Sequence, residues 1–90
     1  MDVRENIQRI IINNTPQMAI VELTEIIASD GNCWLAYLER GKLYWNEGKI
    51  KNAMNDYIMA DRLNPDSIAG EILRHSIDII QFRNIDILNP

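Results

Sequence analysis

The sequence predicts an all-α protein built from antiparallel helical hairpins, and three observations lead to this fold class. Apolar residues recur three and four positions apart along most of the chain, which is the period of an amphipathic helix. No stretch alternates polar and apolar residues as a half-buried strand does. Turn residues separate the helical stretches at short intervals, so consecutive helices should run antiparallel.

The first helix is expected over residues 2–13. Four apolar residues share one face of this helix: Val3, Ile7, Ile10 and Ile11. Asp2 and Glu5 lie near its start, where negative charge favours the positive end of the helix dipole. These features predict an amphipathic helix with a defined beginning.

The second helix is expected over residues 16–29. Thr15 is a candidate N-cap, and Pro16 occupies the first helical position, where proline is favoured. Its apolar residues repeat the same pattern: Ala19, Ile20, Leu23, Ile26 and Ile27. The turn sequence SDGN at 29–32 marks its end.

Three further helices are predicted. The third runs from about Cys33 to Asn46, and Gly48 suits the left-handed position that follows a helix end. The fourth covers about 50–63 and is closed by the turn NPDS. The fifth begins at about Ser67 and reaches 82 or 83. The short, Asn-rich tail that follows has no assignable structure.

Length, composition and charge restrict the class of protein. A chain of 90 residues with 47% hydrophobic and 24% charged residues fits a single globular domain. A net charge of −4 without a basic cluster argues against nucleic-acid binding. The apolar runs are far shorter than the ~20 residues that span a bilayer, and no signal-peptide pattern is present. The single cysteine, Cys33, favours a reducing compartment, so we expect a cytoplasmic protein with neither membrane nor nucleic acid as a partner.

Turn signals and small residues repeat about 34 residues apart. The pairs are Thr15-Pro16 with Gly48-Lys49, Asp30-Gly31 with Asn64-Pro65, and Ala19 with Ala53. Direct identity between the two halves is very low, so the period lies in the pattern of residue types. A period of this length is typical of arrays of helical hairpins.

Residues 34–67 carry the characteristic residues of a known repeat at this period. In order they are Tyr37, Arg40-Gly41, Tyr44, Gly48, Ala53, Tyr57, Ala60 and Pro65. This order resembles the tetratricopeptide repeat, whose pattern is an aromatic residue, Leu-Gly, Tyr, Ala, a second aromatic and Pro. The resemblance implies a short right-handed superhelix of one degenerate repeat (2–33), one full repeat (34–67), a closing helix (68–83) and a tail (84–90).

The glycine of this pattern has a physical explanation. Glycine inside a helix costs about 0.5–1 kcal/mol relative to alanine, so Gly41 requires a close contact that excludes a side chain. We expect Gly41 and Ala53 where the third and fourth helices cross, with Tyr37, Tyr44 and Tyr57 around the crossing.

Arg40 stands where leucine is usual, and its guanidinium is expected to reach solvent. Solvated polar faces are expected for the acidic residues Glu22, Glu25, Asp56 and Asp61.

The sequence offers little catalytic chemistry. Cys33 and His75 could be imagined as a nucleophile and its base, but nothing in the sequence places them together, and no third orienting group accompanies them. One cysteine and one histidine do not make a zinc site. We therefore expect no catalytic residues, no metal site and no cofactor, and we predict that the protein is not an enzyme.

The resemblance to tetratricopeptide repeats implies a concave groove lined by the first helix of each hairpin. The matching positions are Arg4, Gln8, Ile11, Leu35, Leu38, Lys42, Trp45, Ile72 and Ile79. Trp45 would be a plausible binding hot spot. In the alternative interpretation, Trp45 and Leu38 only pack on the neighbouring first helix. Glu39, Ala69 and Leu73 replace the polar and basic residues with which some members hold a peptide carboxylate, so an apolar or mixed peptide is expected.

The predicted fifth helix has two apolar edges, which is more apolar surface than packing on one neighbour uses. Tail residues (Ile85, Ile87 and Leu88) could cover it, or another chain could. We expect a homodimer. The candidate self-association residues are Leu73, Ile77, Ile80, Phe82, Ile85 and Leu88. The expected function is a non-catalytic adaptor that binds a protein or peptide; the alternative is a purely structural self-assembling module or a subunit of a larger complex.

Overall fold

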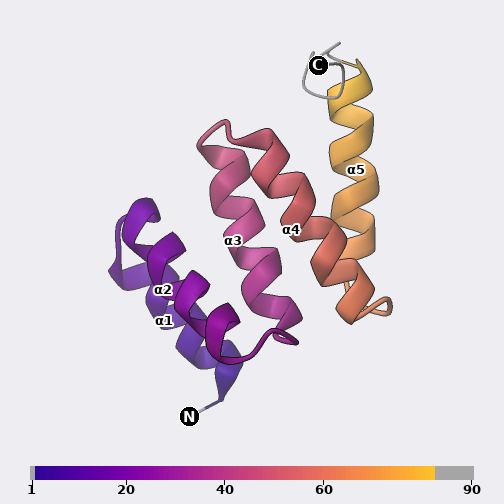
Figure 1. The fold of residues 1–90 in the computed structure, drawn as a ribbon. Helices are drawn as coiled ribbons and strands as arrows, with labels where there is room; N and C mark the ends of the chain where they lie inside the picture. The colour runs from indigo at the N-terminus through magenta and orange to yellow at the C-terminus, as the bar shows by residue number, and fades with distance from the viewer. Residues whose placement is uncertain (1, 83–90) are drawn as a thin grey trace.

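Two antiparallel helical hairpins and a fifth helix make up the protein in the computed structural model, which describes residues 2–82 (Figure 1). The helices are α1 (Val3–Asn13), α2 (Pro16–Ser29), α3 (Trp34–Asn46), α4 (Ile50–Leu63) and α5 (Ala69–Phe82). No strand occurs among the described residues. The all-α prediction is therefore confirmed, and the tail 84–90 lies outside the described part.

Local side-chain chemistry fixes the helix ends. The Asp2 carboxylate accepts a hydrogen bond from the Arg4 amide, and the Thr15 hydroxyl accepts one from the Met18 amide, both at 3.2 Å. Thr15 is the N-cap expected for α2, and Asp2 is the N-cap of α1, which begins one residue later than predicted. The fifth helix begins two residues later than predicted, because the Ser67 hydroxyl accepts a hydrogen bond from the Ala69 amide at 3.2 Å. Ser67 thus caps this helix and does not form part of its first turn.

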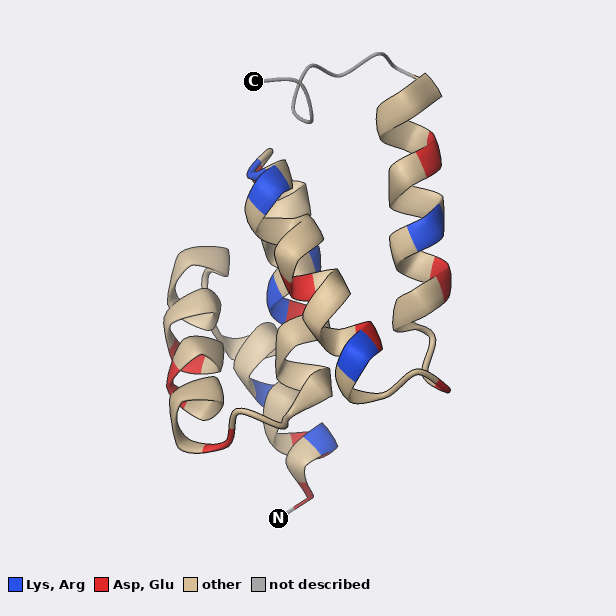
Figure 2. Cartoon of the chain, turned by 45° about the vertical axis from the view of Figure 1, so that its right-hand side comes forward, with Lys and Arg blue, Asp and Glu red and all other residues tan. Residues whose placement is uncertain are grey.

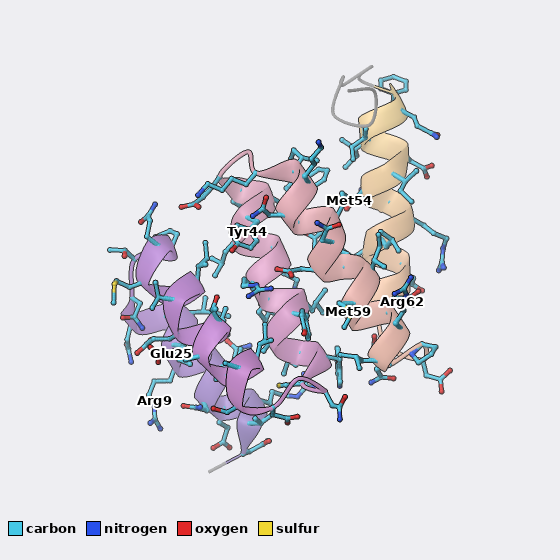
Figure 3. The ribbon with its side chains drawn as sticks, in the orientation of Figure 1. Arg9, Glu25, Tyr44, Met54, Met59 and Arg62 are labelled. Carbon is cyan, nitrogen blue, oxygen red and sulfur yellow. The ribbon has the colours of Figure 1, made fainter. Side chains whose placement is uncertain are left out.

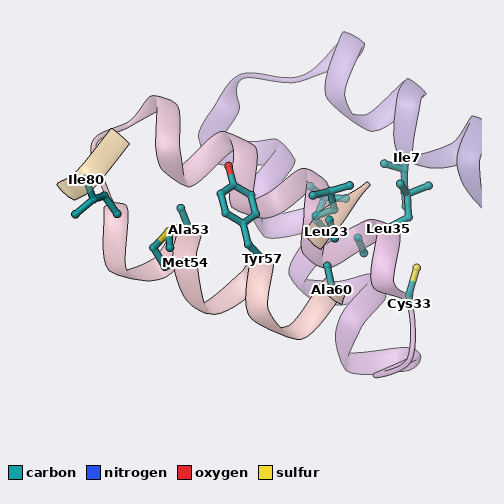
Figure 4. Packing of buried hydrophobic residues seen from close by; sticks show 12 residues of the cluster. Ile7, Leu23, Cys33, Leu35, Ala53, Met54, Tyr57, Ala60 and Ile80 are labelled. Atoms are coloured by element: carbon teal, nitrogen blue, oxygen red, sulfur yellow. The ribbon is translucent and has the colours of Figure 1, made fainter. Parts of the chain in front are cut away.

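Each helix packs on the one before it, and α1 also touches α3. The buried core runs through all five helices (Figure 4). Its largest fully buried side chains are Ile7, Leu23, Leu38 and Ile80. Four alanines are fully buried between the helices: Ala36, Ala53, Ala60 and Ala69. Figure 1 shows α4 lying between α3 and α5.

Helices α3 and α4 approach too closely for a side chain at Gly41. A Cβ atom built there would lie 2.7 and 2.8 Å from two ring carbons of Tyr57 and 3.1 Å from the Asp56 Cβ. Ala53 is fully buried on the α4 side. This is the close crossing expected of Gly41 and Ala53. Tyr57 fills the space beside it, whereas Tyr37 and Tyr44 lie beside Arg40.

The predictions that the Arg40 guanidinium reaches solvent and that Asp56 lies on a solvated face are wrong. Asp56 is only 4% exposed. The Arg40 Nε and Nη2 atoms donate to the two Asp56 carboxylate oxygens at 2.8 and 2.7 Å, and Nη1 donates to the Thr24 hydroxyl at 3.1 Å. The rings of Tyr37 and Tyr44 lie 5.6 and 5.7 Å from the guanidinium carbon. This two-point ion pair ties α2, α3 and α4 together.

The ion pair changes the pKa of Arg40. The hydrogen bond to Asp56 raises the pKa of Arg40 above its ordinary value, against the opposing effect of burial. Helical periodicity missed this pair because it compares positions within one helix, whereas residues 40 and 56 meet across the crossing beside Gly41.

Charged residues of α5 lie along its outer edge (Figure 2). Glu71, Arg74 and Asp78 are all exposed, as expected for the last helix of an array. Within residues 2–82, every helix is too short or too polar to cross a membrane.

Candidate functional site

A hollow of about 300 Å³ opens between α3, α4 and α5. It is lined by one residue near the end of α3, one in the middle of α4, the residue before α5 and a row along α5: Trp45, Tyr57, Ile68, Glu71, Ile72, His75, Ser76 and Ile79. The lining is mainly apolar, with a few polar groups, which is the usual character of a ligand site. We call this the α3–α5 hollow.

The sequence of α5 explains why the hollow has an apolar wall. Ile72 and Ile79 recur at helical spacing on one edge of the helix, and Ile68 extends this edge just before the helix begins. The other edge, which includes Ala69, Leu73 and Ile80, packs on the core. One edge therefore attaches α5 to α4, and the other faces the hollow.

This packing corrects the predicted self-association surface. Ile80 is 2% exposed, and Leu73 and Ile77 pack against the buried core within the chain. Ile80 is therefore enclosed within the monomer, whereas Leu73 and Ile77 are half-buried on the same edge of α5. Phe82 is 92% exposed, and Ile85 and Leu88 lie outside the described residues.

Two aromatic rings line the α3–α5 hollow beside one another. The ring centroids of Trp45 and Tyr57 are 6.5 Å apart, with planes inclined at 35°. Tyr57 is 3% exposed, and burial raises the pKa of its phenol to about 12, with further contributions from the negative charges of Glu39 and Asp56. The phenol is therefore protonated over the physiological pH range, and Tyr57 presents mainly its ring to this site.

Polar groups at the hollow differ in their availability. The Ser76 hydroxyl donates to the Ile72 carbonyl oxygen at 2.7 Å, so its proton is already used within α5. Glu71 and His75 are exposed. The hollow can thus offer a carboxylate and an imidazole to a ligand that covers its apolar wall.

The residues predicted to line one concave groove lie at separate places in the structure. Of the predicted residues, Trp45, Ile72 and Ile79 line the α3–α5 hollow. Leu35 and Leu38 are only 8% and 2% exposed, which corrects their expected place on an open surface. Both residues lie on α3, which packs against α1 and α2 as well as against α4, and these contacts enclose them.

The remaining predicted groove residues lie elsewhere. Arg4 borders a separate hollow of about 320 Å³ next to Leu35 and Cys33. Gln8 is exposed, and Ile11 packs on the core. The Lys42 ammonium pairs with the Glu39 carboxylate at 3.0 Å. None of these four predicted residues (Arg4, Gln8, Ile11 and Lys42) lines the α3–α5 hollow.

Potential reactive groups are not gathered at one place. Cys33 is buried beside the N-terminal end of α1, whereas His75 lines the α3–α5 hollow. Within the described part of the chain, no group of three or more Cys, His, Asp or Glu side chains is arranged to hold a metal ion.

Comparison with protein-family models, with curated proteins and with solved structures gives no match to this chain. The likeness to tetratricopeptide repeats therefore rests on residues 34–67 alone.

Sequence reasoning found part of the site and missed part of it. The Ile68–Ile72–Ile79 edge was visible in the periodicity of α5, and Trp45 was identified from its place on the helix opposite Gly41. Tyr57 was assigned to packing only, because the repeat pattern gives that position a structural role. His75 and Glu71 carried no signal of their own, since single polar residues on a helix are ordinary.

Proposed function

We propose that this protein is a non-catalytic interaction module of tetratricopeptide type that binds an apolar or mixed peptide segment in the α3–α5 hollow. The observation that carries the proposal is the apolar wall formed by Trp45, Ile72 and Ile79 in an open hollow. A half-buried tryptophan flanked by isoleucines is the kind of surface on which binding hot spots occur. Glu71 and His75 at the same place would orient a ligand through hydrogen bonds.

Tryptophan fluorescence tests this proposal directly. The Trp34→Phe variant leaves Trp45 as the only tryptophan, so its emission reports on the α3–α5 hollow. We expect apolar peptides from a panel graded in apolar content to shift this emission to the blue, because binding removes water from the indole. Polar peptides should leave it unchanged.

A pair of matched variants distinguishes the hollow from the rest of the surface. Ile72→Ser removes apolar wall and should weaken binding roughly tenfold or more. Ile58→Ser, at an exposed position of α4 outside the hollow, should leave the affinity unchanged. Equal losses in both variants, or no emission change with any peptide, would contradict the proposal.

We also propose self-association as a second candidate role, and the exposure of Phe82 supports it. A phenylalanine that is 92% exposed at the end of a helix leaves a large apolar side chain in water. Of the predicted self-association residues that the structure describes, Phe82 is the most exposed, Leu73 and Ile77 are half-buried, and Ile80 is buried.

A further inference from the structure

The two ends of the helical stack differ in character. At the α5 end, the outer edge of the helix carries the charged residues Glu71, Arg74 and Asp78, and Phe82 is exposed at its last position. At the other end, α1 and α2 leave a hollow of about 420 Å³ between them. Its lining includes three apolar side chains (Val3, Ile10 and Ile26) and three carboxylates (Glu22, Glu25 and Asp30). We call this surface the α1–α2 end face.

Apolar side chains on the end face are incompletely covered. Val3 is 48% exposed, and Ile10 and Ile26 are half-buried at the bottom of the hollow. Met18, which is 51% exposed, precedes Glu22 and Glu25 by one and two helical turns and falls on the same arc of α2. Met18 thus adds a further exposed apolar side chain to α2 beyond the hollow, next to the carboxylates.

The carboxylates of the end face have no cationic partner in the chain between residues 2 and 82. The ion pairs there are Arg40–Asp56, Lys42–Glu39 and Lys49–Glu47. Glu22 accepts a hydrogen bond from the neutral Asn14 amide at 2.6 Å. Figure 3 shows Glu25 on α2, at the end of the molecule opposite α5. An apolar strip with unpaired negative charges beside it is therefore presented to solvent.

We propose that the α1–α2 end face docks an amphipathic helix of another protein, with lysine or arginine residues flanking the apolar stripe of that helix. Two antiparallel helices form a groove in which the side chains of a third helix can interdigitate. The apolar stripe would cover Val3, Ile10 and Ile26, and the basic flank would meet the carboxylates of α2 and of Asp30.

Charge disfavours a second copy of this chain as the occupant. A two-fold contact between two end faces would bring the three carboxylates of each copy into one interface, with Arg4 and Arg9 as the basic residues that α1 and α2 offer to offset them. Stacking of the end face of one copy on the outer edge of α5 of another copy is no better matched in charge, because that edge carries Glu71 and Asp78 against a single Arg74. A basic partner is the complementary one.

A designed peptide tests the proposal without knowledge of the natural partner. The probe is a labelled amphipathic peptide of roughly 18 residues, long enough to form a helix, with leucines on one face and lysines on the flanks. Its matched control replaces every lysine with glutamate. We expect fluorescence anisotropy to detect binding of the lysine peptide only, weaker at higher salt, and the amide NMR shifts to concentrate in α1 and α2.

Two variants and one control locate the contact. Glu25→Gln should weaken binding about two- to fivefold, the effect of one exposed charge pair, and Val3→Ser should weaken it further. Asp78→Asn changes the charge equally on the outer edge of α5 and should have no effect. Equal binding of both peptides, equal losses in Glu25→Gln and Asp78→Asn, shifts confined to the α3–α5 hollow, or a dimer that Val3→Ser dissociates would each overturn the proposal.

Discussion

At the scale of single residues, the α3–α4 crossing depends on Gly41, Arg40 and Tyr57. Gly41 allows the helices to approach, and Tyr57 occupies the space that a Cβ would need. Arg40 reaches across the crossing to the buried carboxylate of Asp56. The three residues act as one unit, so substitutions here should affect stability far more than substitutions on the outer faces.

Gly41→Ala should lower the free energy of unfolding by about 1–2 kcal/mol. Overpacking destabilises by about 1–3 kcal/mol, and the higher helix propensity of alanine relative to glycine offsets at most ~1 kcal/mol of this loss. Gly31→Ala is the matched control, because a Cβ there would meet only the Ile27 carbonyl oxygen at 4.0 Å. Urea unfolding measures both, and an unchanged midpoint for Gly41→Ala would show that Tyr57 yields without cost.

Arg40→Met should destabilise the fold by roughly 3 kcal/mol, because it leaves the Asp56 carboxylate buried without its partner. Lys42→Met removes the partner of Glu39 at a position where the lysine side chain is 45% exposed, so its effect should stay within about 1 kcal/mol. Both values come from urea unfolding at neutral pH. Similar losses in the two variants would mean that Arg40–Asp56 behaves as an ordinary surface pair.

Tyr57 should make stability fall at high pH. Its pKa is raised from 10.0 to about 12 in the folded protein, so its contribution to stability is complete below pH 10 and is lost as the pH rises toward 12. Tyr57→Phe should therefore lose less stability than the parent protein over this range. Tyr37→Phe serves as the control and should lose stability between pH 10 and 12 as the parent protein does. If Tyr37→Phe retained its free energy of unfolding over this range as well as Tyr57→Phe, the assignment of the effect to Tyr57 would be contradicted.

At the scale of helices, short-range chemistry decides where each element begins and ends. Thr15 and Pro16 start α2, and the carboxylate of Asp2 caps α1. Gly48 follows α3 with a φ of 77°, which is the left-handed conformation expected from the sequence. These signals act within a few residues, and for that reason they could be identified before the structure was known.

Gly48→Ala should cost about 1 kcal/mol through backbone strain alone, since nothing lies within 4 Å of a Cβ at this position. Gly48→Asn should cost less, because asparagine tolerates the left-handed region. Thermal or urea unfolding distinguishes the two. Equal stability of the alanine variant and the parent protein would indicate that the α3–α4 turn adopts another conformation.

At the scale of the whole molecule, the placement of α5 decides which surfaces remain open. Because α5 rests on α4, one of its apolar edges packs on the core and the other borders the α3–α5 hollow. The α1–α2 end face and Phe82 are the further apolar surfaces at the two ends of the stack. A small module of this kind can present separate surfaces to separate partners.

The solution mass across a concentration series tests the homodimer prediction. We expect a dimer whose dissociation constant rises about tenfold or more in Phe82→Ser, because burying a phenylalanine contributes about 1.5–3 kcal/mol. Ile12→Ser, at a 74% exposed position of α1, should leave the mass unchanged. A monomer at every concentration would contradict self-association and leave the binding of another protein as the role of the exposed surfaces.

The sequence by itself determined the fold class, the boundaries of the helices to within two residues and the close contact at Gly41. These features depend on local periodicity, on capping and turn residues and on the size of one residue. Only the tertiary structure decided that Arg40 pairs with a buried Asp56, that Leu35, Leu38 and Ile80 are enclosed, and that Tyr57 lines a hollow. Those outcomes depend on which faces of different helices meet, and residue spacing within one helix carries no information about that.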